Sequence, residues 1–199
     1  MHVEVRPATL RDLCYTASNA QDIDKREIIA SGPRNMTEAG YLTHHLTETV
    51  GGVAFCVWVD GNPEYAFGFT RQSELMPWLF SGWAWGSKKT ALCMPEMSRW
   101  AHGRLIPMLD ELGAARIEAR SIHDHHEAHR WLLWLGFKKE ADLVDWGRDR
   151  ARFVLFAWVR SEFDEGLLRN ARRAKPDVLW RLTTIASTTP PDALNGRRR

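Results

Sequence analysis

The residues with the greatest capacity for chemistry are four histidines and two acids within seven consecutive positions. They are His123, Asp124, His125, His126, Glu127 and His129. Histidine exchanges protons near neutral pH, so His125 and His126 are our candidates for a catalytic acid or base. His125 and His129 stand four residues apart and could share a metal on a helix, but the His-Glu-x-x-His spacing of zinc peptidases is missing. We therefore assign no metal site, and we take Asp124 as a helix N-cap.

The helix that carries these histidines continues with an apolar face. Four residues follow the i, i+3, i+4, i+7 spacing of one helix face. They are Ala128, Trp131, Leu132 and Leu135. Gly136 stands where a helix usually ends, because glycine adopts the left-handed C′ conformation at low cost. Residues 115–121 alternate before the helix and a mixed segment follows Phe137, so the region predicts a strand, a helix and a second strand.

Periodicity predicts the other elements in the same way, with alternating or continuous apolar runs as strands and helical spacing as helices. The predicted strands cover residues 3–6, 53–59, 64–71, 79–85, 115–121, 140–146 and 153–159, and the other predicted helices cover 9–20, 22–30, 37–50 and 95–112. Thr9 and Thr37 have N-cap chemistry, and Pro95 suits a first helical turn. Pro107 should bend its helix or remove a hydrogen bond. The order β, α, α, α, β, β, β, α, β, α, β, β predicts an α+β fold.

Composition and charge restrict the class of protein. With 199 residues, the chain is long enough for one domain at 1–160 and an extension at 161–199. No apolar run approaches the ~20 residues of a membrane span, and three scattered cysteines form no metal or disulfide set. A cytoplasmic protein is therefore expected. Residues 1–159 carry a net charge of −2 and residues 160–199 a net charge of +4.

The helix from His125 to Phe137 resembles one in the GNAT acyltransferase superfamily, where the pattern Asn-x-x-Ala-x-x-Phe-Tyr-x-x-x-Gly-Phe borders the acyl-CoA cleft. Ala128 and the pair Gly136-Phe137 match that pattern, whereas His125 replaces Asn and Leu132 replaces Tyr. The element order over residues 3–160 is also that of the superfamily. The resemblance implies a GNAT-like fold, with a central mixed, mostly antiparallel sheet between helices.

Several segments are most similar to GNAT-type proteins of tailed phages, some of which are internal virion proteins. The segments are Val-Arg-Pro-Ala-Thr at the start, Asp-Ile-Asp-Lys-Arg-Glu-Ile-Ile-Ala-Ser-Gly, Trp-Ala-Trp-Gly, Ala-His-Arg-Trp-Leu and Phe-Val-Leu-Phe-Ala-Trp. This narrower resemblance implies a bacteriophage protein that is incorporated into the virion.

The superfamily resemblance implies acyl transfer from acetyl-CoA to an amine, with the CoA diphosphate on the loop after the strand at 79–85. The residues that would bind the cofactor there are Trp85, Gly86, Lys88, Lys89 and Thr90. The Arg/Gln-x-x-Gly-x-Gly/Ala pattern of that loop is missing, so the two glycines that allow backbone amides to approach a phosphate are missing too. The two lysines would supply only flexible positive charge.

Two catalytic groups of the superfamily are also replaced. The strand at 79–85 has no glutamate to serve as a base, and Leu132 cannot protonate a leaving thiolate as the superfamily tyrosine does. We therefore favour a non-catalytic or nearly inactive protein that serves as a virion or assembly component and is rich in tryptophan, with ten such residues. The alternative is an acetyl-CoA-dependent N-acyltransferase that uses His125, His126 or Lys88.

The extension at 161–199 would supply the partner contacts. It begins with a helical pattern and ends in a Thr/Pro-rich tail with three arginines. Contacts with other virion proteins are expected there, and the basic tail could also bind nucleic acid. A tail that only keeps the protein in solution fits the same residues.

Overall fold

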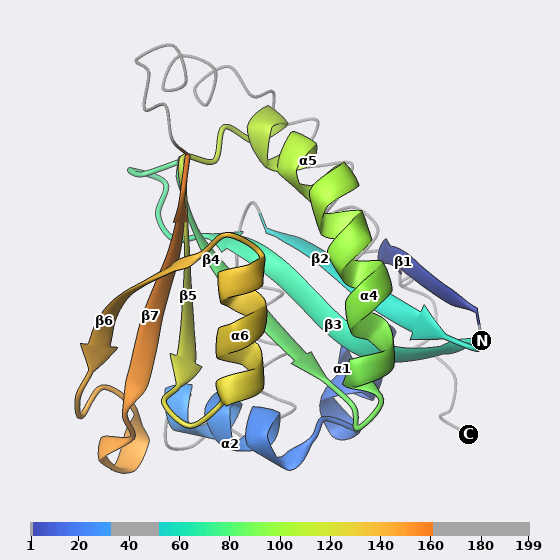
Figure 1. The fold of residues 1–199 in the computed structure, drawn as a ribbon, viewed down its shortest axis with the longest axis horizontal. Helices are drawn as coiled ribbons and strands as arrows, with labels where there is room; N and C mark the ends of the chain where they lie inside the picture. The colour runs from blue at the N-terminus through green and yellow to red at the C-terminus, as the bar shows by residue number, and fades with distance from the viewer. Residues whose placement is uncertain (1, 33–51, 161–199) are drawn as a thin grey trace, which may run out of the picture.

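The computed structural model describes residues 2–32 and 52–160 (Figure 1). The predicted helix at 37–50 and every prediction for 161–199 lie outside these residues. The described residues contain no helix that is long and apolar enough to cross a membrane.

The described elements follow the predicted order and confirm an α+β fold. They are β1 (Val3–Pro7), α1 (Leu10–Ser18), α2 (Asp22–Ser31), β2 (Val53–Val59), β3 (Asn62–Arg71), β4 (Leu79–Gly86), α4 (Thr90–Trp100), the π-helical turn η1 (Ala101–Leu105), α5 (Ile106–Glu111), β5 (Arg116–Ile122), α6 (His126–Trp134), β6 (Lys138–Leu143), the 3-10 turn η2 (Arg148–Arg150) and β7 (Phe153–Val159). The strands form one sheet in the order β1-β2-β3-β4-β5-β7-β6. Every neighbouring pair is antiparallel except β4 and β5, which are parallel.

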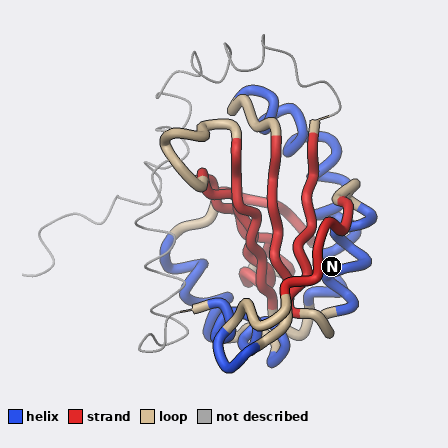
Figure 2. Tube along the Cα trace, turned by 90° about the vertical axis from the view of Figure 1, so that its left-hand side faces the viewer, coloured by secondary structure: helices blue, strands red, loops and turns tan. Residues whose placement is uncertain are grey.

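The sheet is covered by helices on both faces, and its strands supply a core to each face. Alternate residues of a strand point to opposite faces. In β2, Phe55 and Val57 pack in the larger core with α4, whereas Cys56 packs in a second core with α1 and α2. Figure 2 shows the strands as a layer between helices. Because both faces are buried, β2 reads as a continuous apolar run, as the sequence predicts.

Strands β4 and β5 separate after a short paired segment. Their parallel pairing joins Leu79–Gly82 to Arg116–Ala119 and goes no further along either strand. Beyond Gly82 the two strands diverge (Figure 1). The second half of β4 and the end of β5 are therefore not paired with each other. Their backbone and side chains can line the space that opens between the two strands.

The cap of α1 forms as the sequence predicts. The Thr9 hydroxyl accepts a hydrogen bond from the Asp12 N–H at 3.3 Å, and the Asp12 carboxylate accepts one from the Thr9 N–H at 2.9 Å. This reciprocal arrangement is a capping box, which pairs two N–H groups that the first helical turn otherwise leaves unbonded.

The prediction that a helix begins at Pro95 is wrong, because α4 begins five residues earlier, at Thr90. Pro95 lies inside α4, although a proline there cannot donate the usual helical hydrogen bond. The predicted disturbance at Pro107 is confirmed. The helix passes through the π-helical turn η1, and Pro107 then lies at the first residues of α5, where its missing N–H costs little.

Helix α6 begins one residue later than predicted and ends where predicted. Its N-cap is His125, so the assignment of Asp124 to that position is wrong, and the Asp124 carboxylate instead pairs with Arg26 at 2.6 Å. At the other end Gly136 has φ +91°. The Gly136 N–H bonds to Leu133 O at 3.1 Å and the Phe137 N–H bonds to Leu132 O at 3.0 Å, which together make a Schellman motif.

Replacing Gly136 with alanine should lower the free energy of unfolding by about 1 kcal/mol, because the left-handed conformation strains any residue with a Cβ. The nearest atom to an added Cβ is Trp158 Cδ1 at 3.8 Å, so the cost comes from the backbone and not from a clash. Gly103→Ala is the matched control, since a Cβ there meets nothing within 4 Å. Urea denaturation of both variants checks this, and equal destabilisation by both would contradict it.

Candidate functional site

A cleft of about 550 Å³ occupies the space where β4 and β5 separate. Its walls come from α2, the second half of β4, the end of β5, and helices α4 and α6. The α4 and α6 side is apolar, with Met94, Met97, Ala128, Trp131 and Leu132 among its lining residues. Asp24 and Glu27 of α2 face His125 at one end of the cleft, and Glu127 and Arg130 of α6 are further charged lining residues, so the cleft has an apolar part and a polar end.

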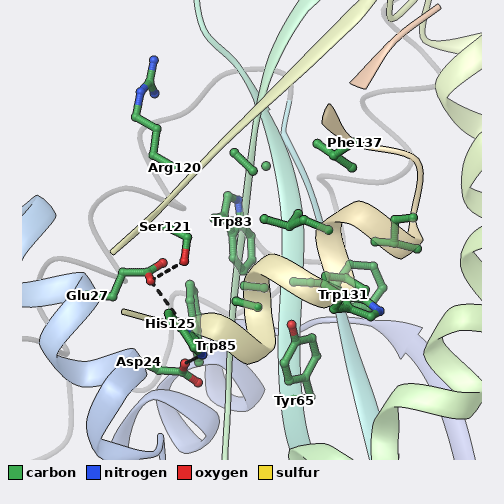
Figure 3. Close-up of a pocket in the computed structure, with 18 of the residues that line it drawn as sticks. Asp24, Glu27, Tyr65, Trp83, Trp85, Arg120, Ser121, His125, Trp131 and Phe137 are labelled. Carbon is green, nitrogen blue, oxygen red and sulfur yellow. Dashed lines mark hydrogen bonds and ion pairs between the residues drawn. The ribbon is translucent and has the colours of Figure 1, made fainter. Parts of the chain in front are cut away.

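The polar end holds a histidine between two carboxylates (Figure 3). His125 Nδ1 lies 3.2 Å from Glu27 Oε2, and His125 Nε2 lies 3.6 Å from Asp24 Oδ1. The side chains of His125 and Asp24 are almost fully buried. Asp24 and Glu27 are three residues apart in α2 and therefore share one face of that helix.

The hydrogen bonds of Glu27 fix which nitrogen of His125 carries a proton. Glu27 Oε2 also accepts from the Ser121 hydroxyl at 2.8 Å and from the Ile122 N–H at 2.9 Å. An ionised carboxylate only accepts, so His125 Nδ1 must donate to it. His125 Nε2 is then the nitrogen that can gain or lose a proton, and it faces Asp24.

The surroundings of Asp24 and His125 raise the pKa values of both groups. Burial raises the pKa of Asp24 to about 6, although hydrogen bonds from the Gly86 N–H and Gln21 and the charge of His125 oppose this shift. Burial lowers the pKa of His125, but the hydrogen bond and charge of Glu27, with the charge of Asp24, outweigh burial and leave it raised. Both pKa values move up, which favours a proton on this pair near neutral pH.

The chain matches no protein-family model and no curated protein. Solved acetyltransferases nevertheless share its fold. A putative acetyltransferase from Salmonella typhimurium, solved with its cofactor acetyl-CoA, superposes with a TM-score of 0.60 at 14% identity, over 81% of this chain and 96% of that one. The ribosomal-protein-S5-alanine acetyltransferase from Vibrio fischeri gives 0.59 at 16% identity, over 82% and 96%. A GNAT-family acetyltransferase from Streptococcus pneumoniae gives 0.54 at 12% identity, over 79% and 99%.

The chain has the GNAT fold. This confirms the fold that the resemblance implied. At these identities the likeness concerns the fold, and the chemistry of the cleft has to come from the residues of this chain.

Only one of the two proposed catalytic histidines lies at the cleft of this GNAT fold. His125 lines it, whereas His126 is exposed and has its ring beside that of His129, with centroids 6.1 Å apart. His129 Nε2 lies 3.1 Å from the Ile122 carbonyl oxygen. Within residues 2–32 and 52–160, no group of three or more His, Cys, Asp or Glu is arranged to hold a metal.

The five proposed cofactor-binding residues have different positions. Trp85 and Thr90 line the cleft, and the Trp85 indole donates to the Thr16 hydroxyl at 3.1 Å. Gly86 is buried and bonded to α2, since its N–H donates to Asp24 at 2.7 Å and its carbonyl accepts from the Gln21 N–H at 2.8 Å. Lys88 and Lys89 are exposed.

The loop of Lys88 and Lys89 does not fit a diphosphate. Glu64, a buried carboxylate from β3, accepts hydrogen bonds from the Ser87 hydroxyl at 2.6 Å and from Lys89 Nζ at 2.7 Å. Ser87 and Lys89 are donors that a phosphate could use, and the negative charge of Glu64 already accepts from both.

Sequence reasoning missed Asp24, Glu27 and Tyr65. Asp24 and Glu27 carried one local signal, two carboxylates at i and i+3 on a helix face, which is also common on solvated helices. Tyr65 lies on β3 in a run of apolar residues, and it lines the cleft with its ring centroid 6.4 Å from that of Trp131. Figure 3 shows the Tyr65 hydroxyl directed toward the other cleft residues.

Proposed function

We propose that this protein is an N-acyltransferase that moves an acyl group from a thioester to an amine in the cleft between β4 and β5. The observation that carries the proposal is the buried Asp24–His125 pair, held by Glu27 at one end of an apolar channel. Two raised pKa values in a cleft mark a proton-accepting group that is tuned toward neutral pH. A histidine with a purely structural role could be held by Glu27 alone. Burial of the second carboxylate, Asp24, costs free energy that such a role would not require.

The chain's residues supply the proton transfers. A thioester supplies an acyl carbon that is already activated toward attack. An amine is protonated near neutral pH and must lose that proton before it attacks. When the Asp24–His125 pair has released its shared proton, it accepts one from the amine. The new N–C bond replaces the C–S bond, and the nitrogen then loses its second proton, which offsets the proton that the leaving thiolate takes up. One proton remains on the Asp24–His125 pair and is released to solvent, so the reaction releases one proton overall.

Tyr65 is the proposed source of the proton for the leaving thiolate. Burial raises the pKa of its phenol well above the ordinary value, so the hydroxyl stays protonated. It lies across the cleft near Trp131, in the apolar part where a thiolate would be poorly solvated. Tyr65 would therefore take the role that the superfamily tyrosine has, which falls at Leu132 in the sequence.

Acetyl-CoA is the donor that the fold suggests, because the structural neighbour from Salmonella typhimurium was solved with it. The apolar channel would receive the acyl group and the pantetheine arm. The loop before α4 does not fit the diphosphate, so no step depends on that part of the molecule.

Filling the channel tests the proposal. Ala128 lies on α6 at the cleft, and leucine is a good helix former, so Ala128→Leu should keep the fold while its side chain occupies the channel. We expect kcat/KM for amine-dependent thiol release, measured with a thiol reagent and a panel of amines, to fall about tenfold. Ala128→Ser is the size-matched control and should fall less than threefold. Equal rates for the leucine variant and the wild-type protein would contradict the position of the site.

A second proposal is a role as a virion or assembly component in a bacteriophage. It is supported by the sequence resemblance and by the loop that holds Glu64 where the superfamily holds a diphosphate. In this proposal residues 1–160 are the GNAT-like domain, and 161–199 is an extension that contacts other virion proteins or nucleic acid. The protein would be made in the cytoplasm and packaged. Mass spectrometry of purified particles tests it, and absence of the chain from the particles would reject it.

A further inference from the structure

The loop from Gly86 to Thr90 is folded around the carboxylate of Glu64. Glu64 Oε2 accepts from the Ser87 hydroxyl at 2.6 Å, and Glu64 Oε1 lies 2.7 Å from Lys89 Nζ. The Ser87 N–H also donates to the Glu64 backbone oxygen, at 2.8 Å. The Glu64 side chain is 7% exposed, so its negative charge is buried inside the loop.

Most backbone N–H groups of this loop also have acceptors. An anion at a helix N-terminus binds to the N–H groups that the first turn leaves unbonded. Here five N–H groups of the loop and of the first turn of α4 donate to acceptors of this chain. The pairs are Gly86 N–H to Asp24, Ser87 N–H to Glu64 O, Lys89 N–H to Ser87 Oγ, Thr90 N–H to Ser87 O and Leu92 N–H to Lys89 O, all between 2.7 and 3.0 Å.

Glu64 therefore serves as the anion of this loop. A diphosphate that entered would meet a buried like charge, and it would have to displace Glu64 from Lys89 and Ser87. The hydrogen bond of Lys89 to Glu64 and the charge of that group raise the pKa of Lys89, which agrees with their ion pair. A diphosphate would therefore have to break the contacts of Ser87 and Lys89 with Glu64 before it could use those donors.

We propose that the acyl donor is bound through its acyl group and pantetheine arm, and that its adenosine diphosphate part makes no favourable contact with the described residues. This inference rests on the proposed acyl transfer and specifies its donor. The donor class is an acyl thioester of pantetheine or phosphopantetheine. The apolar channel past Met94, Met97, Trp131 and Leu135 provides the binding surface for that arm.

A comparison of donors on the wild-type protein tests this directly. We expect kcat/KM for acetyl-pantetheine to lie within about threefold of that for acetyl-CoA. A loop that holds a diphosphate through several charge-assisted hydrogen bonds would instead favour acetyl-CoA by about hundredfold or more. A carrier protein loaded with acetyl-phosphopantetheine is the third donor. A higher kcat/KM for it than for acetyl-pantetheine assigns a carrier-borne donor, and an equal or lower value assigns a small thioester.

Glu64→Gln provides the second measurement. The amide keeps the size of the side chain and can still accept from Ser87, but it removes the negative charge. We expect the preference for acetyl-CoA over acetyl-pantetheine to rise about tenfold, and ADP binding to become measurable by calorimetry. Glu96→Gln removes the same charge from the exposed surface of α4, where Glu96 pairs with Arg99, and it should change neither quantity.

The outcomes separate the two proposals. If acetyl-CoA is preferred about hundredfold by the wild-type protein, this inference is wrong and acyl transfer stands. If ADP binds the wild-type protein and Glu64→Gln equally well, the inference is also wrong, because Glu64 then does not occupy the anion position. If no thioester acylates any amine, acyl transfer itself is wrong and the inference fails with it.

Discussion

Replacement of His125 with alanine should lower kcat/KM for acyl transfer by about 10²- to 10³-fold, the range expected when a general base is removed. His125 Nε2 is the nitrogen that exchanges a proton, because Glu27 holds the proton on Nδ1. The loss should appear in kcat more than in KM, since the imidazole acts on the amine proton and not on the thioester arm. Steady-state kinetics with acetyl-pantetheine and a reactive amine measures both constants.

Two controls separate catalysis from folding in that experiment. His123→Ala removes an exposed histidine just before α6 and should leave kcat within about twofold, since its side chain is 54% exposed. Added imidazole should restore part of the activity of His125→Ala, because the vacated space opens to the cleft. A variant that is fully folded and as active as the wild-type protein would show that His125 is a structural histidine.

Asp24→Asn should lower kcat at high pH by about tenfold to hundredfold and move the rising limb of the pH profile to lower pH. In the wild-type protein the charge of Asp24 raises the pKa of His125, although burial acts in the opposite direction. Without that charge the imidazole loses its proton at lower pH and is a weaker base. An Asn oxygen can still accept from the Gly86 N–H, which keeps the end of β4 in place. A profile of kcat between pH 5 and pH 9 measures the position of this rising limb.

The stability of the Asp24→Asn variant should depend on pH with a defined sign. The pKa of Asp24 is raised from 3.8 to about 6 in the folded protein. Its contribution to stability is therefore fully present below pH 3.8 and is lost as the pH rises through about 6. The variant lacks this loss, so its free energy of unfolding should fall less between pH 4 and 6 than that of the wild-type protein. Parallel curves would contradict the raised pKa.

Local sequence patterns were sufficient for the elements whose signals lie within a few residues. The Schellman motif at Gly136, the capping box at Thr9 and the continuous apolar run of β2 all depend on neighbours in the chain. The start of α4 was missed because Pro95 is a strong local signal for a first turn. The turn of Ser87 and Lys89 around Glu64, which precedes α4, is set by a residue 23 positions earlier in the chain.

The site was harder to predict because its contacts are long-range. Ser121 and Glu27 are 94 positions apart, and His125 and Glu27 are 98 positions apart. No local sequence pattern predicts contacts over such separations. His125 and His126 were therefore equally good candidates in the sequence. The fold turns His125 into the cleft and leaves His126 exposed. The missing glycines of the loop were visible in the sequence, but the carboxylate that occupies the loop was not.

The most direct measurement is the mass of the amine after incubation with the folded protein and acetyl-pantetheine. Thiol release alone also reports hydrolysis, whereas the product mass reports the new N–C bond. Acyl transfer through the Asp24–His125 pair predicts an amine heavier by one acetyl group, formed by the wild-type protein at a rate at least about hundredfold above that of His125→Ala. An unmodified amine with every thioester and amine tested, or equal acetylation by both proteins, would contradict it.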